Sequence, residues 1–135
     1  MARRTITIWN QSSFDSDYSP PVPQLALEIS GPDLNKWYMV ENAVVDTGAD
    51  WTIIPESILS QIEAYEWDQA RLRSQWGESR TVYRYEIDMR IAAKIFRGVL
   101  VVSDDMGNEV IIGRNLLNWL KVLIDGPNQK VELIE

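Results

Sequence analysis

The residues with the clearest chemical potential form one short run, Asp46-Thr47-Gly48, which directly follows the apolar residues Ala43 to Val45. A carboxylate at the end of an apolar strand is costly to bury unless it has a partner or a chemical task. Thr47 supplies a hydroxyl that can form a hydrogen bond across a tight turn. Gly48 lets the backbone turn sharply and approach a ligand closely. The run therefore predicts an acid held at the edge of a hydrophobic core.

The chain contains no cysteine and no histidine, and this restricts its chemistry. Disulfides, a thiol nucleophile, a Ser-His-Asp triad and a histidine-ligated zinc are all excluded. If the chain is a hydrolase that uses its own side chains, carboxylates are the natural general acids and bases, although lysine and tyrosine remain possible. The acidic residues Asp104, Asp105 and Glu109 are expected to be solvated loop charges, so we expect no metal and no cofactor.

Length and charge narrow the class of protein further. The 135 residues suggest a single domain, and the net charge of -7 argues against nucleic-acid binding. The chain has no polybasic patch for an anionic membrane and no apolar run near the ~20 residues that span a bilayer. Polar residues such as Thr7 and Asn10 interrupt the N-terminal segment, unlike the apolar core of a signal peptide. We therefore expect a cytoplasmic protein with no membrane partner.

Alternating patterns predict the strands that lead to Asp46. Residues 5–9 form a short β-branched strand pattern, and residues 10–21 are polar and end in proline, which favours a loop. Apolar residues alternate over 22–29, turn chemistry follows over 30–33, and the strand pattern resumes at Lys36. The acid is therefore expected to follow an antiparallel hairpin.

Beyond Asp46 the pattern changes to a helix and then returns to strands. Pro55 suits a first helical position, and the helix is expected to end between Ala64 and Ala70. Gly77 is a plausible hairpin tip, followed by an alternating strand over 81–91 and a continuous apolar strand over 98–102.

A second informative run lies near the C-terminus. In Ile111-Ile112-Gly113-Arg114-Asn115 a buried strand ends at Gly113 and passes directly into a short helix. Two further strands are expected, over 121–125 and 130–134, with a turn between them.

The two runs together resemble the motifs of the retropepsin-like aspartic proteases. In that family, hydrophobic residues followed by Asp-Thr-Gly are later matched by two hydrophobic residues, a glycine and often Arg-Asn. The resemblance covers about residues 22–134 and implies a mainly β fold, a closed barrel with one or two short helices, as a homodimer. It divides the chain into an N-terminal extension of strand plus loop, residues 1–20, and a protease domain, residues 21–135. The C-terminal segment after the helix is more similar to bacterial or cellular members than to viral ones.

The resemblance also implies roles for individual residues. Asp46 would be the catalytic acid, the Thr47 hydroxyl would bond across the dimer axis, and Gly48 would bring backbone toward the substrate. Substrate contacts would come from the loop residues Ala49 and Asp50 and from the flap tip, Trp76 and Gly77. Structural support would come from Ile112, Gly113 and Arg114.

Several of these roles compete with simpler interpretations. Asp50 and Arg114 match family positions that pair within a subunit, but an ordinary surface ion pair is the alternative. Trp76 matches the flap, but an exposed hairpin aromatic is equally consistent with the pattern. The next residue after Asp50 is Trp51, which is bulkier than the small polar residue usual there, so the neighbouring pocket is expected to be narrowed.

A single Asp-Thr-Gly run implies a second subunit. Peptide hydrolysis without a covalent intermediate needs one carboxylate as base and another as acid, so the partner is expected to be Asp46 of a second copy. The strand over 131–134 is the candidate for pairing between subunits, and residues 5–9 are candidates to join it. The substrate would be an extended peptide or protein segment bound between the subunits.

Two other functions stay open at this point. One is a catalytically weak or inactive retropepsin-fold module for dimerisation or peptide binding. The other is a monomer that needs a different partner chain. The intact Asp46-Thr47-Gly48 run favours an active endopeptidase, because a scaffold has little need for such an acid.

Overall fold

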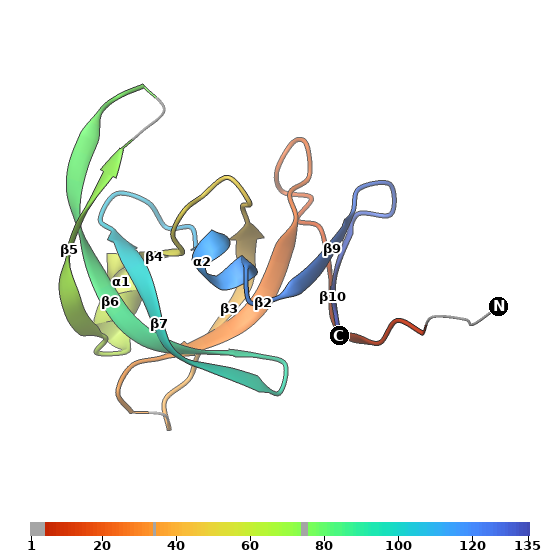
Figure 1. The fold of residues 1–135 in the computed structure, drawn as a ribbon, viewed down its shortest axis with the longest axis horizontal. Coiled ribbons are helices and arrows are strands. Elements are labelled where there is room, and N and C mark those ends of the chain that lie inside the picture. Colours follow the sequence, from red (N-terminus) through yellow and green to blue (C-terminus); the bar gives the residue numbers. More distant parts are fainter. Residues whose placement is uncertain (1–4, 34, 74–75) are drawn as a thin grey trace.

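The computed structural model describes residues 5–33, 35–73 and 76–135, and in these ranges the chain is mainly β-structure (Figure 1). The expected fold class, mainly β with one or two short helices, is confirmed. In chain order the elements are β1 (Ile8–Ser13), β2 (Gln24–Ser30), β3 (Tyr38–Val45), β4 (Ile53–Pro55), α1 (Glu56–Gln61), β5 (Tyr65–Arg73), β6 (Ser79–Ile91), β7 (Lys94–Asp104), β8 (Ile111–Ile112), α2 (Arg114–Leu117), β9 (Lys121–Asp125) and β10 (Lys130–Ile134).

Six strands close into a barrel around the apolar core, as expected. The strands are neighbours in the order β2, β3, β8, β4, β7 and β6, and β2 pairs with β6 to complete the ring. Successive side chains of a strand point to opposite faces, so an alternating sequence buries one apolar face. In β2 the buried set is Leu25, Leu27 and Ile29, and in β6 it includes Met89 and Ile91.

A parallel strand pair determines where the two sequence motifs emerge. β8 lies between β3 and β4, and it runs parallel to β3 with Val45 opposite Ile112. Because parallel neighbours end at the same edge of a sheet, Asp46 and Gly113 leave the barrel together. The backbone N–H of Asp46 donates a hydrogen bond to the carbonyl of Ile112 at 3.0 Å, which fixes this arrangement.

The β5–β6 hairpin extends away from the barrel (Figure 1). β5 is the edge strand of the seven-stranded sheet, and it pairs with the first half of β6 from Tyr65 opposite Glu86 to Arg73 opposite Ser79. Gly77 lies in the turn with φ of +85°, a left-handed backbone that glycine adopts without strain. The predicted hairpin turn at Gly77 is therefore present.

The first helix is shorter than the sequence indicates. We expected it to end between Ala64 and Ala70, but α1 ends at Gln61, and β5 begins at Tyr65. Glu63 adopts a left-handed backbone with φ of 52°, which ends the helix. The residues that follow mix helix formers, such as Glu66 and Gln69, with the strand-favouring Tyr65 and Trp67, and their pairing with β6 makes them a strand.

A separate three-stranded sheet is formed by the first strand and the last two strands, in the order β1, β10, β9. The strand expected over residues 5–9 lies instead over Ile8–Ser13, because polar residues expected in a loop pair with β10. Residues 131–134, the candidate for pairing between subunits, offer no free strand edge within one chain, because β10 is central and the edges are β1 and β9. Residues 1–4 of the predicted extension lie outside the described residues.

Candidate active site

The acid loop begins where β3 ends and folds into one tight turn. The Asp46 carboxylate accepts a hydrogen bond from the backbone N–H of Gly48 at 2.9 Å, and the Asp46 carbonyl accepts one from the N–H of Ala49 at 3.2 Å. The Asp46 side chain is half-buried, whereas Thr47 and Gly48 are exposed on the chain surface. The structure thus places the acid at the rim of the barrel, with its backbone anchored in the core strand.

Gly113 lets the second motif pack directly against this loop. A Cβ atom at Gly113 would lie 2.4 Å from both the carbonyl carbon and the oxygen of Trp51. Any residue other than glycine would therefore clash with the backbone of Trp51. The N–H of Arg114 donates to the carbonyl of Ala49 at 2.9 Å. Ile112, immediately before the glycine, is fully buried in the core. The first turn of α2 therefore contacts the backbone of the acid loop.

The Arg114 side chain, which follows Gly113, also contacts the acid loop at two points. Its Nη1 donates to the carbonyl of Thr47 at 3.1 Å, and its Nη2 forms an ion pair with Asp50. The two charged side chains are 46% and 71% exposed, so their attraction contributes little to the stability of the fold. The bond to the Thr47 carbonyl goes beyond an ordinary surface ion pair, and it orients the backbone next to Asp46.

A buried hydroxyl–amide network beneath the loop was missed by the sequence analysis. The fully buried Thr52 donates from both its backbone N–H and its Oγ1 to the side-chain oxygen of Asn115, at 2.8 and 2.9 Å. The N–H of Gly113 donates to the same Thr52 hydroxyl at 3.2 Å, and the Asn115 amide donates to the carbonyl of Leu100 at 2.7 Å. A polar Thr52 inside an apolar run, and Asn115 next to Arg114, are the signals that could have revealed it.

Replacing Thr52 with valine is expected to lower the free energy of unfolding by about 1–3 kcal/mol, because the N–H of Gly113 would lose its buried acceptor. Urea denaturation at a fixed protein concentration measures this change. The exposed Thr7 provides the matched control, since Thr7→Val should leave the unfolding midpoint nearly unchanged. An equal effect of both substitutions would contradict the structural role of the network.

One face of the β5–β6 hairpin is directed toward the acid loop. Alternation along β6 places Arg80, Val82 and Arg84 on the same face, and the guanidinium of Arg84 lies 5.1 Å from the centre of the Trp51 ring. Trp76, 82% exposed, and Gly77 lie at the tip of this hairpin rather than in the loop. The structure thus brings together the loop residues 46–50 and Ile112 to Arg114, and it places the two hairpin residues on a separate element.

The sequence model of the retroviral aspartyl protease family matches residues 20–125. The chain belongs to this family. The resemblance to retropepsin-like aspartic proteases is therefore confirmed. No curated protein matches the chain in sequence.

Solved structures of this family share the fold at low sequence identity. The retropepsin-like aspartic protease from Rickettsia conorii is 14% identical, with a TM-score of 0.64 over 99% of this chain and 97% of that protein. The EIAV protease complexed with the inhibitor HBY-793 is also 14% identical, with a TM-score of 0.56 over 72% of this chain and 86% of that one. At this identity the likeness establishes the fold.

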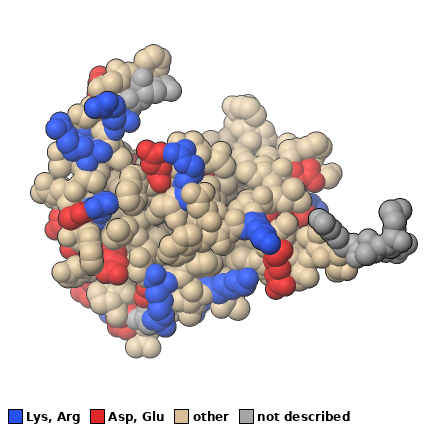
Figure 2. Space-filling model, in the orientation of Figure 1, with Lys and Arg blue, Asp and Glu red and all other residues tan. Residues whose placement is uncertain are grey.

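Basic side chains gather near the tip of the β5–β6 hairpin of this family member, at the upper left of Figure 2, although the whole chain is acidic. Arg80 reaches from the hairpin to the end of β7, where its nitrogens lie 3.9 Å from Asp104, the last residue of the strand, and 4.0 Å from Asp105, the next residue. These long, exposed contacts connect the hairpin weakly to the neighbouring loop.

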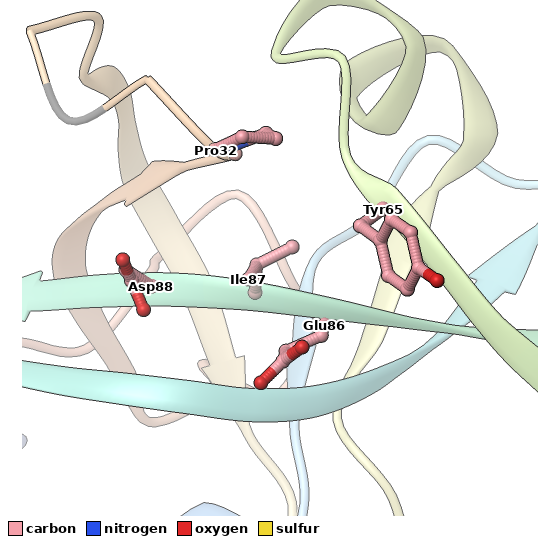
Figure 3. A pocket seen from close by; sticks show the side chains of 6 residues that line it. Pro32, Tyr65, Glu86, Ile87 and Asp88 are labelled. Atoms are coloured by element: carbon pink, nitrogen blue, oxygen red, sulfur yellow. The ribbon is translucent and has the colours of Figure 1, made fainter.

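A pocket of about 290 Å³ has a lining that includes no residue of the acid loop. Pro32 and Tyr65 flank Ile87 there, and two carboxylates, Glu86 and Asp88, belong to the lining (Figure 3). The Asp88 carboxylate already accepts a hydrogen bond from the N–H of Gly98 at 2.9 Å. Nothing in this lining contributes to the family's motifs, so the acid loop remains the candidate active site.

The ion pair between Asp68 and Arg84 predicts a pH dependence of stability. Hydrogen bonding from Arg84 lowers the pKa of Asp68 below its ordinary value of 3.8. A carboxylate with a depressed folded-state pKa stabilises the protein above its unfolded-state pKa, and this contribution is lost as the pH falls through the folded-state value. Asp68→Asn should therefore lower the urea midpoint at pH 6 and have a vanishing effect at pH values well below 3.8. A difference that is the same at both pH values would contradict this.

Among the helices of the described residues, none has the length and apolar character needed to cross a membrane.

Proposed function

We propose that the chain is an aspartic endopeptidase whose active centre is completed by a second copy of the chain. The observation that carries this proposal is the Asp46-Thr47-Gly48 turn, which the Ile112 carbonyl and the Arg114 side chain hold at the rim of the barrel. An acid presented in this way can reach a group outside its own chain. Membership of the aspartyl protease family supports the same chemistry.

The proposed chemistry needs two carboxyl groups. One acts as base to activate a water molecule, and the other acts as acid to protonate the leaving amine. Two carboxyls in hydrogen-bond contact share one proton and titrate as a pair, as is established for aspartic proteases as a class. The sequence contains one Asp-Thr-Gly run, so the second carboxyl would be Asp46 of a second copy related by a two-fold axis. In this homodimer the Thr47 hydroxyls would bond across the axis.

The substrate would be an extended peptide bound between the two subunits by strand-like hydrogen bonds. Gly48, Ala49 and Asp50 would contact its backbone from the loop side, and Trp76 and Gly77 would cover it from the hairpin, which would serve as a flap. The proposed place of this activity is the cytoplasm.

Digestion of a peptide library between pH 4 and 7, with and without a pepstatin-type inhibitor, tests the proposed activity. Sedimentation at micromolar concentration tests the assembly, because a homodimer has twice the 15.5 kDa mass of the chain. Binding of peptides without cleavage would instead indicate the non-catalytic module. A persistent 15.5 kDa species that is inactive alone would indicate a different partner chain.

A further inference from the structure

The Trp51 ring lies against an arginine at the base of the β5–β6 hairpin, and this arginine is itself held by an ion pair. The Arg84 guanidinium lies 5.1 Å from the ring centre. The same guanidinium donates from Nε to one carboxylate oxygen of Asp68 at 2.6 Å and from Nη2 to the other. Such a two-point pair fixes the plane of an arginine, and an arginine over a tryptophan face is attracted by the ring electrons. The half-buried Arg84 therefore connects both strands of the hairpin to the acid loop.

The backbone on either side of Trp51 is also fixed. Asp50, before it, pairs with Arg114, and Thr52, after it, is bonded to Asn115. The tryptophan carbonyl is packed against Gly113. Rotation of its side chain is the main freedom left to this residue, and Arg84 is placed to remove that freedom.

We propose that Arg84 is a positioning residue for substrate selection. It holds the Trp51 ring in one orientation beside the acid loop, so that only a small peptide side chain fits next to the ring. This inference rests on the proposed function, since it concerns the same site. A large ring directly after Asp50 narrows the space next to the loop. When the ring is free to turn aside, that space opens and larger side chains fit.

The chain contains a matched control for this arrangement. Arg90 lies on the same strand, forms an ion pair with Glu28, and has its guanidinium 4.4 Å from the centre of the Trp37 ring. Six residues of β-strand separate Arg84 from Arg90, which corresponds to about 20 Å. Trp37 precedes the start of β3, whereas Trp51 follows its end, so the second cluster lies toward the opposite end of the barrel. The two clusters share their chemistry and differ in their distance from Asp46.

The test compares Arg84→Lys with Arg90→Lys in the full chain. Lysine keeps the charge but lacks the planar, two-point geometry of arginine, so each substitution releases its own tryptophan ring. Profiling of cleavage sites in a peptide library should show that Arg84→Lys relaxes a preference for small side chains at one substrate position by about threefold to tenfold. The change should appear mainly in KM. Arg90→Lys should keep the wild-type profile, and Trp51→Ala should relax the same position further.

Three results would overturn the inference. One is a wild-type profile without a preference for small side chains at any position, and another is an Arg84→Lys profile that matches that of Arg90→Lys. If the wild type shows no cleavage that depends on Asp46, the proposed function fails separately. In that case the inference is tested without cleavage, by measuring which library peptides bind to the Asp46→Asn chain with and without Arg84→Lys. An Arg84→Lys substitution that leaves this binding pattern unchanged is the third contrary result.

Discussion

Replacing Asp46 with asparagine is expected to lower kcat/KM for peptide hydrolysis by at least ~10³-fold, because an amide can act neither as the general base nor as the general acid. The fold should survive, since the asparagine side-chain oxygen can still accept the hydrogen bond that the N–H of Gly48 donates at 2.9 Å. Initial rates on a peptide found by library digestion measure the loss, and urea denaturation checks that stability is kept. Cleavage that persists at the wild-type rate would exclude Asp46 as the catalytic acid.

Asp33 offers a matched control for this substitution. Its carboxylate accepts a hydrogen bond from the N–H of Asn35 at 3.0 Å, the same two-residue spacing as in the Asp46 turn. Asp33 lies in the turn between β2 and β3, before β3 begins, whereas Asp46 follows the end of β3. Asp33→Asn should therefore leave kcat/KM unchanged within about twofold.

Mixing wild type with the Asp46→Asn chain separates a shared active centre from two independent ones. If subunits exchange freely, a heterodimer contains one carboxylate and should be inactive. At equal amounts and constant total protein, about one quarter of the wild-type activity should remain, because only dimers of two wild-type subunits are active. An activity of about one half would indicate that each chain acts alone.

Gly113→Ala is the second substitution with a large expected effect, a loss of about 3 kcal/mol in the free energy of unfolding. Its added Cβ would lie 2.4 Å from the backbone carbonyl of Trp51, and a backbone group held by neighbouring strands cannot move aside as a flexible side chain can. The backbone of Gly113 is extended, with φ of -97°, so the cost is steric contact and not an unfavourable dihedral angle. Urea denaturation at one fixed protein concentration measures it.

Gly126→Ala serves as the control for this prediction. A Cβ there would meet no atom within 4 Å, and its backbone is outside the left-handed region, so the unfolding free energy should change by less than about 1 kcal/mol. Peptide cleavage by Gly113→Ala should fall together with stability, because displacement of Trp51 also displaces the acid loop. Equal unfolding midpoints for the two alanine variants would show that the loop can yield without cost.

Local sequence determined the strand pattern, the turns and the two motifs, because each of these depends on residues that are close together in the chain. The alternation in β2, the glycine turn at Gly77 and the apolar runs that end at Asp46 and Gly113 each use a short-range rule, either side-chain periodicity or backbone freedom. The two motifs that indicate the family are also local, and the closed barrel is expected from the resemblance that they carry rather than from these short-range rules.

The tertiary structure decided what depends on residues far apart in the chain. Residues 65–70 have mixed propensities and become strand because β6 supplies their hydrogen-bond partners. The strand β10 is central because β1 and β9 pair with its two edges. The bond between Thr52 and Asn115 spans 63 residues, and the contact of Arg84 with Trp51 joins two separate elements. No local pattern encodes such pairs, because the two residues meet only when the barrel closes. Their interaction then stabilises the fold only after the conformational entropy of the intervening chain has been lost.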